Sequence, residues 1–226
     1  MRVLIFGTMF ADTKEKADLA YLWIRLHEGL NRECDLLLVD SASPYPVEVE
    51  GCVLQLGDNI GHLSKGGKDG WGRAFCAGLR YAIKHQYDYV VHIEGDSLCS
   101  LNVMMVCSLM QTCGVRATGV PVRGMKRAEK HWMETGLMFL DVGFIDYRRI
   151  LETYNWQEYQ YKQYPQTPEF WLRQILGDNL CLHTGWKTIR DDRKILTVNN
   201  VHQYDWITHT TPEIFNAFAE NVFEQA

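Results

Sequence analysis

The 226-residue chain contains no apolar run of about 20 residues, the length that a membrane-spanning helix needs. The apolar run from Val3 to Phe6 is also too short for the core of a secretory signal peptide. Internal repeats, low-complexity tracts and clear linkers are absent as well. We therefore expect a single domain spanning residues 1–226, with no transmembrane segment.

The chain also lacks an excess of basic residues. It has 23 Lys and Arg against 28 Asp and Glu, which gives a net charge of −5, and the basic residues are scattered. A nucleic-acid surface requires clustered positive charge. No nucleic-acid partner is expected.

No two cysteines have the CxxC spacing that is typical of metal or redox sites. The chain has seven cysteines, an odd number, and most of them lie in apolar runs. A disulfide framework requires paired cysteines in an oxidising compartment. We therefore expect reduced cysteines in the core of a cytoplasmic protein.

What the chain does have is an alternation of short apolar runs with segments of helical periodicity. Buried strands are predicted at residues 3–6, 36–39, 53–56 and 89–93, and helices near residues 12–30 and after the glycine-rich segment 66–72. This alternation predicts an α/β fold with a mostly parallel sheet flanked by helices. Such sheets bind ligands beyond the carboxyl ends of their strands. Polar residues that follow the strands should therefore gather along one edge, namely Asp40, Asp58, Asn59 and residues 94–97.

The second half of the chain is less regular. Strands are predicted near residues 115–122 and 137–140, and helices at residues 168–176 and 212–223.

The strongest chemical signal is a pair of carboxylates, Glu94 and Asp96, directly after the strand at 89–93. Side chains of an extended chain alternate with period two, so both acids point the same way. Two such carboxylates can hold one hard cation, Mn²⁺ or Mg²⁺, which can bridge a diphosphate. The alternative is a polar strand end, or a cap by Asp96 or Ser97 on the following helix.

The segment before this pair resembles the loop and helix of family 2 glycosyltransferases, and especially the dolichyl-phosphate-mannose synthase branch. The GxGxAxxxGxxxA pattern of that family is filled by Gly70, Gly72, Ala74, Gly78 and Ala82. Residues 38–43 look like its VVDxxS strand end, and residues 57–61 look like its xxNxG turn. The similar segments lie in the family's order across residues 2–100. The alternative for the glycine pattern is a flexible loop before an ordinary amphipathic helix.

The resemblance implies a GT-A (Rossmann-like) fold, with residues 1–100 binding the nucleotide sugar and residues 101–226 supplying the acceptor site and catalysis. It implies metal-dependent sugar transfer with inversion from a UDP- or GDP-sugar to a glycan, lipid or protein acceptor. Asp40 is implied to contact the nucleotide base. The chain departs from the family at Glu94, where Asp is usual, and at residues 6–9, which replace the usual opening. The residues expected at the donor are Phe6, Gly7, Thr8, Asp40, Asn59, Gly70, Trp71, Arg73, Glu94 and Gly95.

The resemblance also implies a carboxylate base at a helix start. Glu169, which follows Pro168, resembles this element, and Glu134 competes with it. The alternative for Glu169 is a first-turn Glu that the helix dipole favours, and the alternative for Glu134 is a solvated loop residue.

A late histidine is a third metal ligand in many metal-dependent GT-A enzymes. His202 is the candidate here, His183 and His209 compete with it, and a structural role is the alternative. His92, inside a strand, is expected to be a core residue with a hydrogen-bonded ring.

Two other functions stay open. A sugar-nucleotide nucleotidylyltransferase shares the general fold but would place a glycine-rich loop with a basic residue directly after the first strand. Residues 7–10 do not provide that loop. A catalytically silent nucleotide- or glycan-binding domain would keep the sheet and lose metal affinity or the base.

Overall fold

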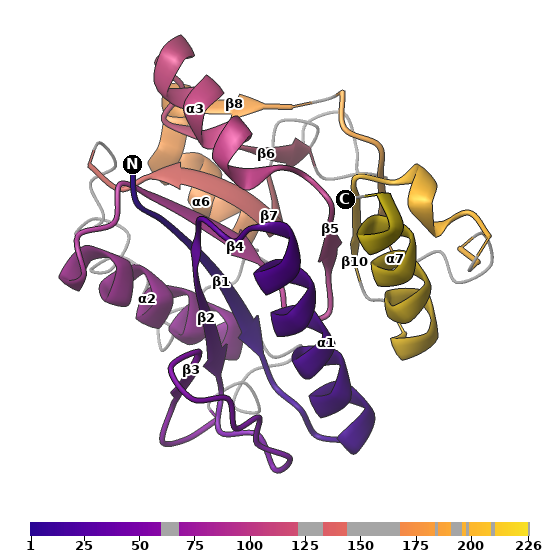
Figure 1. The fold of residues 1–226 in the computed structure, drawn as a ribbon. Coiled ribbons are helices and arrows are strands. Elements are labelled where there is room, and N and C mark those ends of the chain that lie inside the picture. The colour runs from indigo at the N-terminus through magenta and orange to yellow at the C-terminus, as the bar shows by residue number, and fades with distance from the viewer. Residues whose placement is uncertain are drawn as a thin grey trace.

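A computed structural model of the chain describes residues 1–59, 68–121, 133–143, 168–183, 185–190, 196–197, 199–208 and 211–225. In this part of the chain a seven-stranded sheet has the strand order β3-β2-β1-β4-β7-β6-β8 (Figure 1). Its strands are β1 (Val3–Met9), β2 (Asp35–Asp40), β3 (Val53–Gln55), β4 (Tyr89–Ile93), β6 (Ala117–Pro121), β7 (Met133–Asp141) and β8 (Leu180–Leu182).

A small second sheet has the order β5-β10-β9 and lies beside the main one (Figure 1). Its strands are β5 (Leu98–Cys99), β9 (Thr188–Arg190) and β10 (Trp206–Thr208). The described helices are α1 (Lys14–Leu30), α2 (Lys68–Lys84), α3 (Val103–Cys113), α6 (Pro168–Leu176) and α7 (Pro212–Gln225), with 3₁₀ turns η2 (Gly177–Asn179) and η3 (Val201–Gln203).

The first four strands of the main sheet are parallel. β1 pairs in parallel with β2 and β4, and β2 pairs in parallel with β3. β7 is antiparallel to β4 and β6, while β6 and β8 are parallel. The predicted α/β fold with a mostly parallel sheet is confirmed. Because β4 pairs with β7, strands from residues 1–100 and 101–226 form one sheet.

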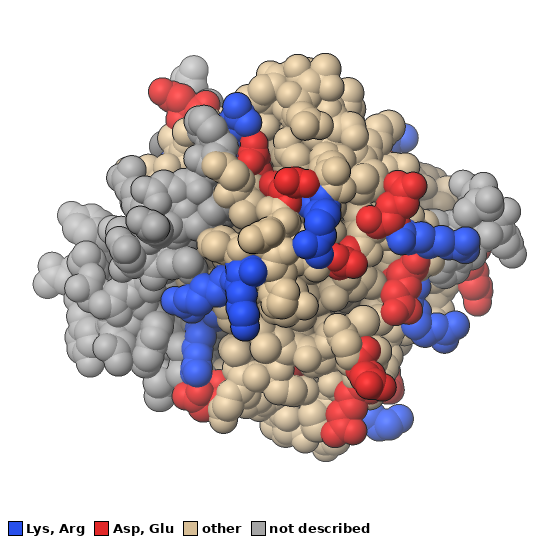
Figure 2. All heavy atoms as spheres, turned by 60° about the vertical axis from the view of Figure 1, so that its left-hand side comes forward, with Lys and Arg blue, Asp and Glu red and all other residues tan. Residues whose placement is uncertain are grey.

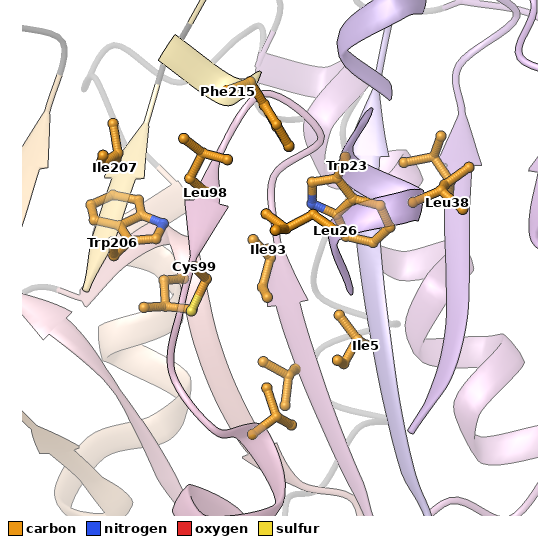
Figure 3. Close-up of a cluster of buried hydrophobic side chains, with 14 of the residues drawn as sticks. Ile5, Trp23, Leu26, Leu38, Ile93, Leu98, Cys99, Trp206, Ile207 and Phe215 are labelled. Atoms are coloured by element: carbon orange, nitrogen blue, oxygen red, sulfur yellow. The ribbon is translucent and has the colours of Figure 1, made fainter. Parts of the chain in front are cut away.

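Two apolar layers cover the faces of this sheet. On one face α1, α3, α7 and the small sheet pack against residues such as Ile5 and Ile93. In Figure 3, Trp23 and Leu26 of α1 lie between Ile93 of β4 and Leu38 of β2. On the other face α2 and α6 pack against alternate residues of the same strands, such as Leu4. Burial on both faces explains why β1 and β4 consist mostly of apolar residues.

The start of α2 differs from the prediction. The glycine-rich segment was expected to be a loop as far as Gly72, but the helix begins at Lys68 and includes Gly70 and Gly72. Trp71 and Phe75, one helical turn apart, stack with ring centroids 4.8 Å apart and planes 12° from parallel. Aromatic packing of this kind offsets the low helix propensity of glycine.

All seven cysteines lie in described residues and are free. Cys76, Cys99 and Cys107 are buried, as expected of core cysteines, but Cys113 and Cys181 are exposed, so the prediction is wrong for these two. Cys113 is the last residue of α3, and Cys181 is the middle residue of β8, the outermost strand of the main sheet, so an apolar neighbourhood in sequence does not imply burial there.

In the described residues, no helix has the length and apolar character that crossing a bilayer requires. On the face drawn in Figure 2, acidic and basic side chains are interspersed.

Candidate functional site

The carboxyl ends of the parallel strands are joined to one another by backbone hydrogen bonds just beyond the strands. These bonds place the ends of β1, β2 and β4 and the first half of β7 at one edge of the sheet, where the predicted polar residues lie. They run from Ser41 N to Met9 O (3.0 Å), from Leu56 N to Asp40 O (2.8 Å), from Gly95 N to Thr8 O (3.1 Å) and from Glu94 N to Gly136 O (3.1 Å).

Asp40, the last residue of β2, is completely buried at this edge. Its Oδ1 accepts hydrogen bonds from the backbone N–H of Ser43, at 3.1 Å, and from the Ser43 hydroxyl. Its Oδ2 has no hydrogen-bond partner among the described residues. A buried carboxylate oxygen without a donor is unfavourable, so this atom is suited to accept a hydrogen bond from a ligand.

Glu94 and Asp96 follow β4 directly and are both half-buried. The Glu94 side chain reaches towards Gly136 of β7. A Cβ at Gly136 would lie 3.2 Å from Glu94 Oε2 and 2.7 Å from Cζ2 of Trp206. Glycine at position 136 therefore leaves the space that the Glu94 carboxylate and the Trp206 ring occupy.

The small sheet contacts the acidic segment, residues 94–97, through Ser97. Ser97 is buried, and its Oγ lies 3.0 Å from Thr208 Oγ1 and 3.5 Å from Asp96 Oδ1. The cap of α3 is Asn102, whose side chain accepts from Met105 N. The alternative that Asp96 or Ser97 caps this helix is therefore wrong.

Carboxylate oxygens are the ligands that Mg²⁺ and Mn²⁺ prefer, so the Glu94–Asp96 pair fits such a cation. Within the described ranges, however, no three His, Cys, Asp or Glu side chains form a group that could hold a metal. His202 is exposed in η3 and is not grouped with the two acids. His183 is exposed after β8, and His209 lies outside the described residues. The metal prediction therefore rests on the carboxylate pair, and His202 as a ligand stays a prediction.

Two residues that were predicted at the donor belong to the core. Phe6 is completely buried under α2, with its ring centroid 5.7 Å from that of Phe75. Packing explains its side chain, and its place at the donor stays a prediction. Gly7 lies under Trp23, and a Cβ there would be 3.0 Å from Cζ2 of that ring. The glycine is explained by this close approach of α1 to the sheet.

Thr8 and Gly95 lie nearer the edge and touch each other. Thr8 is 8% exposed, and its hydroxyl lies 3.1 Å from Nε2 of the buried His92. A Cβ at Gly95 would be 3.1 Å from the Cβ of Met9 and 3.2 Å from Thr8 O. Glycine lets the chain after β4 lie this close to the end of β1 without a shift of its neighbours.

The remaining predicted donor residues lie on α2 and after β3. Trp71 is half-buried and contacts the ring of His92 edge-on. Arg73 forms an ion pair with Asp58, with Nη1 and Oδ1 2.5 Å apart, so its guanidinium is already bound to a carboxylate. Asn59, which directly follows Asp58 in sequence, is half-buried. Gly70 lies in the first turn of α2, and nothing of its surroundings is described.

The two candidate bases lie on different elements. Glu134 is 6% exposed within β7, so the alternative of a solvated loop residue is wrong. Glu169 lies in the first turn of α6, as predicted, and its Oε1 accepts a hydrogen bond from the Thr135 hydroxyl at 3.4 Å. Thr135 was not predicted as part of the site. Its only signal in the sequence is a polar pair, Glu134–Thr135, at the start of an otherwise apolar strand.

His92 occupies the core position that was predicted for it. It is completely buried, and both ring nitrogens have partners, Nδ1 with the Thr135 carbonyl at 2.7 Å and Nε2 with Thr8. Burial lowers the pKa of this ring to about 4, so it is neutral at physiological pH.

No protein-family model matches the chain, and no curated protein matches it in sequence. Its fold, however, matches solved structures of glycosyltransferases over nearly all of its length. A glycosyltransferase involved in the glycosylation of the major capsid of PBCV-1 shares 8% identity, with a TM-score of 0.57 over 99% of this chain and all of the other. The galactosyltransferase LgtC, in complex with donor and acceptor sugar analogues, shares 11% identity, with a TM-score of 0.54 over 99% and 94%.

The glycosyltransferase GlyE of Streptococcus pneumoniae TIGR4 shares 10% identity, with a TM-score of 0.55 over 99% of this chain and 62% of the other. At these identities the matches establish the fold. The expected GT-A architecture is confirmed, and the resemblance to the dolichyl-phosphate-mannose synthase branch stays a prediction.

Proposed function

We propose that this protein is a metal-dependent glycosyltransferase that transfers a sugar from a nucleoside diphosphate to an acceptor hydroxyl. One observation carries the proposal: in a fold that it shares with glycosyltransferases, Asp40 ends β2 while Glu94 and Asp96 follow β4, and these two strands flank β1 with their carboxyl ends at the same sheet edge. This edge is where α/β sheets bind their ligands.

The nucleotide lies over the ends of β1 and β2. Asp40 Oδ2, which is buried and has no described partner, accepts a hydrogen bond from the base or ribose. Trp71, on the face of α2 beside His92, offers an aromatic surface at the same edge. The sequence resemblance supports a UDP- or GDP-sugar, and the acceptor class stays open between glycan, lipid and protein.

Glu94 and Asp96 are the residues that would hold Mn²⁺ or Mg²⁺. When bound, the cation supplies positive charge that stabilises the departing diphosphate. The segment that carries them is a turn, closed by the hydrogen bond from Ser97 N to Glu94 O at 2.9 Å, so the side-chain alternation expected of an extended chain does not apply to the two acids. The contact of Ser97 with Thr208 fixes this turn.

Glu169 is the base in this proposal. The bond between the anomeric carbon and the diphosphate oxygen breaks, and its electron pair leaves with the diphosphate. The acceptor oxygen forms the new bond to that carbon while its proton passes to the Glu169 carboxylate. Direct displacement of this kind inverts the anomeric centre. The hydrogen bond from Thr135 orients one carboxylate oxygen of Glu169 and leaves the other for the acceptor.

A thermal-shift screen with UDP-glucose, UDP-galactose, UDP-N-acetylglucosamine and GDP-mannose, each with and without Mn²⁺, tests the proposal. A donor that binds only the folded state raises the melting temperature. The donor that gives the largest shift is then incubated with the protein, and release of the nucleoside diphosphate is followed.

Slow release that depends on Mn²⁺ supports the proposal. Binding of a donor without release favours a silent binding domain instead. Release of pyrophosphate from a nucleoside triphosphate and a sugar phosphate would identify a nucleotidylyltransferase.

A further inference from the structure

The hydrogen bonds of His92 fix which of its ring nitrogens carries the proton. Nδ1 lies 2.7 Å from the carbonyl oxygen of Thr135, and a carbonyl can only accept. Nδ1 must therefore be the donor. In the neutral ring Nε2 is then the acceptor, and the hydroxyl of Thr8, 3.1 Å away, donates to it. The proton on Nδ1 follows from the carbonyl partner alone.

Three aromatic side chains enclose the ring and keep it in place. The centroids of Phe6, Phe75 and Trp71 lie 5.0, 5.4 and 5.8 Å from the centroid of the His92 ring. Two of these rings come from α2 and one from β1. They leave His92 no freedom to exchange its two hydrogen bonds for water.

The two partners of His92 make further hydrogen bonds to two different parts of the candidate site. The Thr8 carbonyl accepts the hydrogen bond from Gly95 N, next to Glu94. The Thr135 hydroxyl donates to Glu169 Oε1 at 3.4 Å. One buried ring thus lies between the acidic segment after β4 and the candidate base on α6.

The sheet alone does not fix the position of Thr135. β6 and β7 pair at Gly119 with Met138 and again at Pro121 with Met133, so two steps along β6 correspond to five along β7. Thr135 lies inside this irregular stretch, where a regular ladder does not set the direction of its carbonyl. The Nδ1–H of His92 holds that carbonyl instead.

We propose that His92 is a positioning residue, which sets Thr8 and the acidic segment at the donor through Nε2 and sets Thr135 and Glu169 at the acceptor through Nδ1. The inference rests on the proposed function, because it uses Glu169 as the base and the edge after β4 as the donor site. An apolar side chain of similar size would fill the same space without the cost of burying two polar atoms. A merely structural role therefore gives no reason for both bonds.

Two conservative variants separate the two bonds. Asn places an amide nitrogen where the imidazole Nδ1 lies, so His92→Asn keeps the donor to Thr135 and loses the acceptor for Thr8. Gln reaches the position of Nε2, so His92→Gln keeps the acceptor for Thr8 and loses the donor to Thr135. The assay is Mn²⁺-dependent release of nucleoside diphosphate from the sugar nucleotide selected in the thermal-shift screen.

We expect His92→Asn to raise KM for the sugar nucleotide about tenfold with kcat nearly unchanged, and His92→Gln to lower kcat about tenfold with KM nearly unchanged. A tenfold change is the size expected from the loss of one buried hydrogen bond. Thr8→Val should repeat the first pattern and Thr135→Val the second, without any change at position 92. These two variants carry the test if a His92 variant does not fold.

If His92→Asn and His92→Gln, or Thr8→Val and Thr135→Val, changed kcat and KM to the same extent, the positioning role would be wrong. It would also be wrong if the folded variants showed no change. In both cases the proposed function would stand. A wild-type protein that binds no sugar nucleotide, or releases no nucleoside diphosphate, overturns the proposed function and the positioning role together. Nitrogen chemical shifts of the His92 ring in the wild type test the geometry without any activity. A proton on Nε2 rather than Nδ1 would contradict it.

Discussion

The backbone N–H of Gly95 donates a hydrogen bond to the carbonyl oxygen of Thr8, and the two atoms lie 3.1 Å apart. This bond extends the parallel contact between β1 and β4 beyond its last paired residues, Phe6 and His92. It lies between Glu94 and Asp96 in sequence, so the two carboxylates are held against the end of β1. Substitution of Glu94 or Asp96 should therefore affect ligand binding without unfolding the sheet.

Asp96→Ala is expected to abolish the contribution of Mn²⁺ to donor binding, because Asp96 is half-buried at this edge and supplies one of two neighbouring carboxylates. Calorimetric titration with the sugar nucleotide should give the same affinity with and without Mn²⁺. Asp18→Ala, which removes an exposed carboxylate on α1, is the control. A Mn²⁺ effect that persists in Asp96→Ala would show that the cation binds elsewhere.

Asp40→Asn is expected to weaken nucleoside diphosphate and complete sugar nucleotide by the same factor, about 10- to 100-fold, which corresponds to one hydrogen bond to a charged group. The change keeps the shape of the side chain and an oxygen for Ser43. Asp35→Asn, at the opposite end of β2, is the matched control. Loss of affinity for the sugar nucleotide alone would place Asp40 at the sugar.

Glu169→Gln is expected to lower kcat about 10²–10⁴-fold with donor affinity unchanged, because the base acts only on the proton in transit. Glu213 follows Pro212 at the start of α7 just as Glu169 follows Pro168, so Glu213→Gln is the matched control. Glu134→Gln tests Glu134, the competing candidate for the base. If Glu134→Gln loses turnover and Glu169→Gln keeps it, the base is Glu134.

His27 is expected to make folding less favourable as pH falls. Complete burial lowers its pKa from 6.5 to about 3 in the folded protein. Between these values the unfolded chain binds a proton that the folded protein does not, so stability is full above pH 6.5 and decreases as pH falls towards 3. From pH 7 to pH 5 this histidine alone contributes a loss of about 2 kcal/mol in the free energy of unfolding.

His27→Leu should reduce that loss in urea unfolding at the two pH values. His85→Leu, at an exposed histidine, should leave it unchanged. An identical loss in wild type and His27→Leu would mean that His27 is protonated in the folded protein.

Gly136→Ala is expected to destabilise the protein by about 1–3 kcal/mol, because the added Cβ would lie 2.7 Å from the Trp206 ring. It should also reduce Mn²⁺-dependent donor binding, since Glu94 Oε2 would be 3.2 Å from the same carbon. Gly57→Ala meets no atom within 4 Å and is the control in both measurements. Unaltered stability of Gly136→Ala would mean that Trp206 can move aside.

The parallel part of the fold could be predicted because its strands are buried on both faces. β1 and β4 are therefore largely apolar runs, such as residues 3–6 and 89–91, which indicate a strand without any knowledge of its partners. The short strands β8, β9 and β10 carry no such signal. Each has three residues, and its conformation depends on pairing with a distant segment.

The residues of the candidate site also fall into two groups, one predictable from the sequence and one not. Asp40, Glu94 and Asp96 follow strong strands, so their meeting at one edge was predictable. The burial of the Phe6 ring was not predictable, because the sequence does not show that α2 covers the middle of β1. The link from His92 through Thr135 to Glu169 was not predictable either, since it depends on an irregular register within β7.

The contact between Ser97 and Thr208 joins residues 111 positions apart. A ribosome adds about 5–20 residues per second, so the acidic segment emerges roughly 5–20 seconds before the strand that completes its surroundings. During that interval β1, β2 and β4 can already pair, but β5 lacks its only described neighbour, β10. The parallel strands β1, β2 and β4 can therefore pair in the nascent chain before β10 is available to complete the surroundings of the acidic segment.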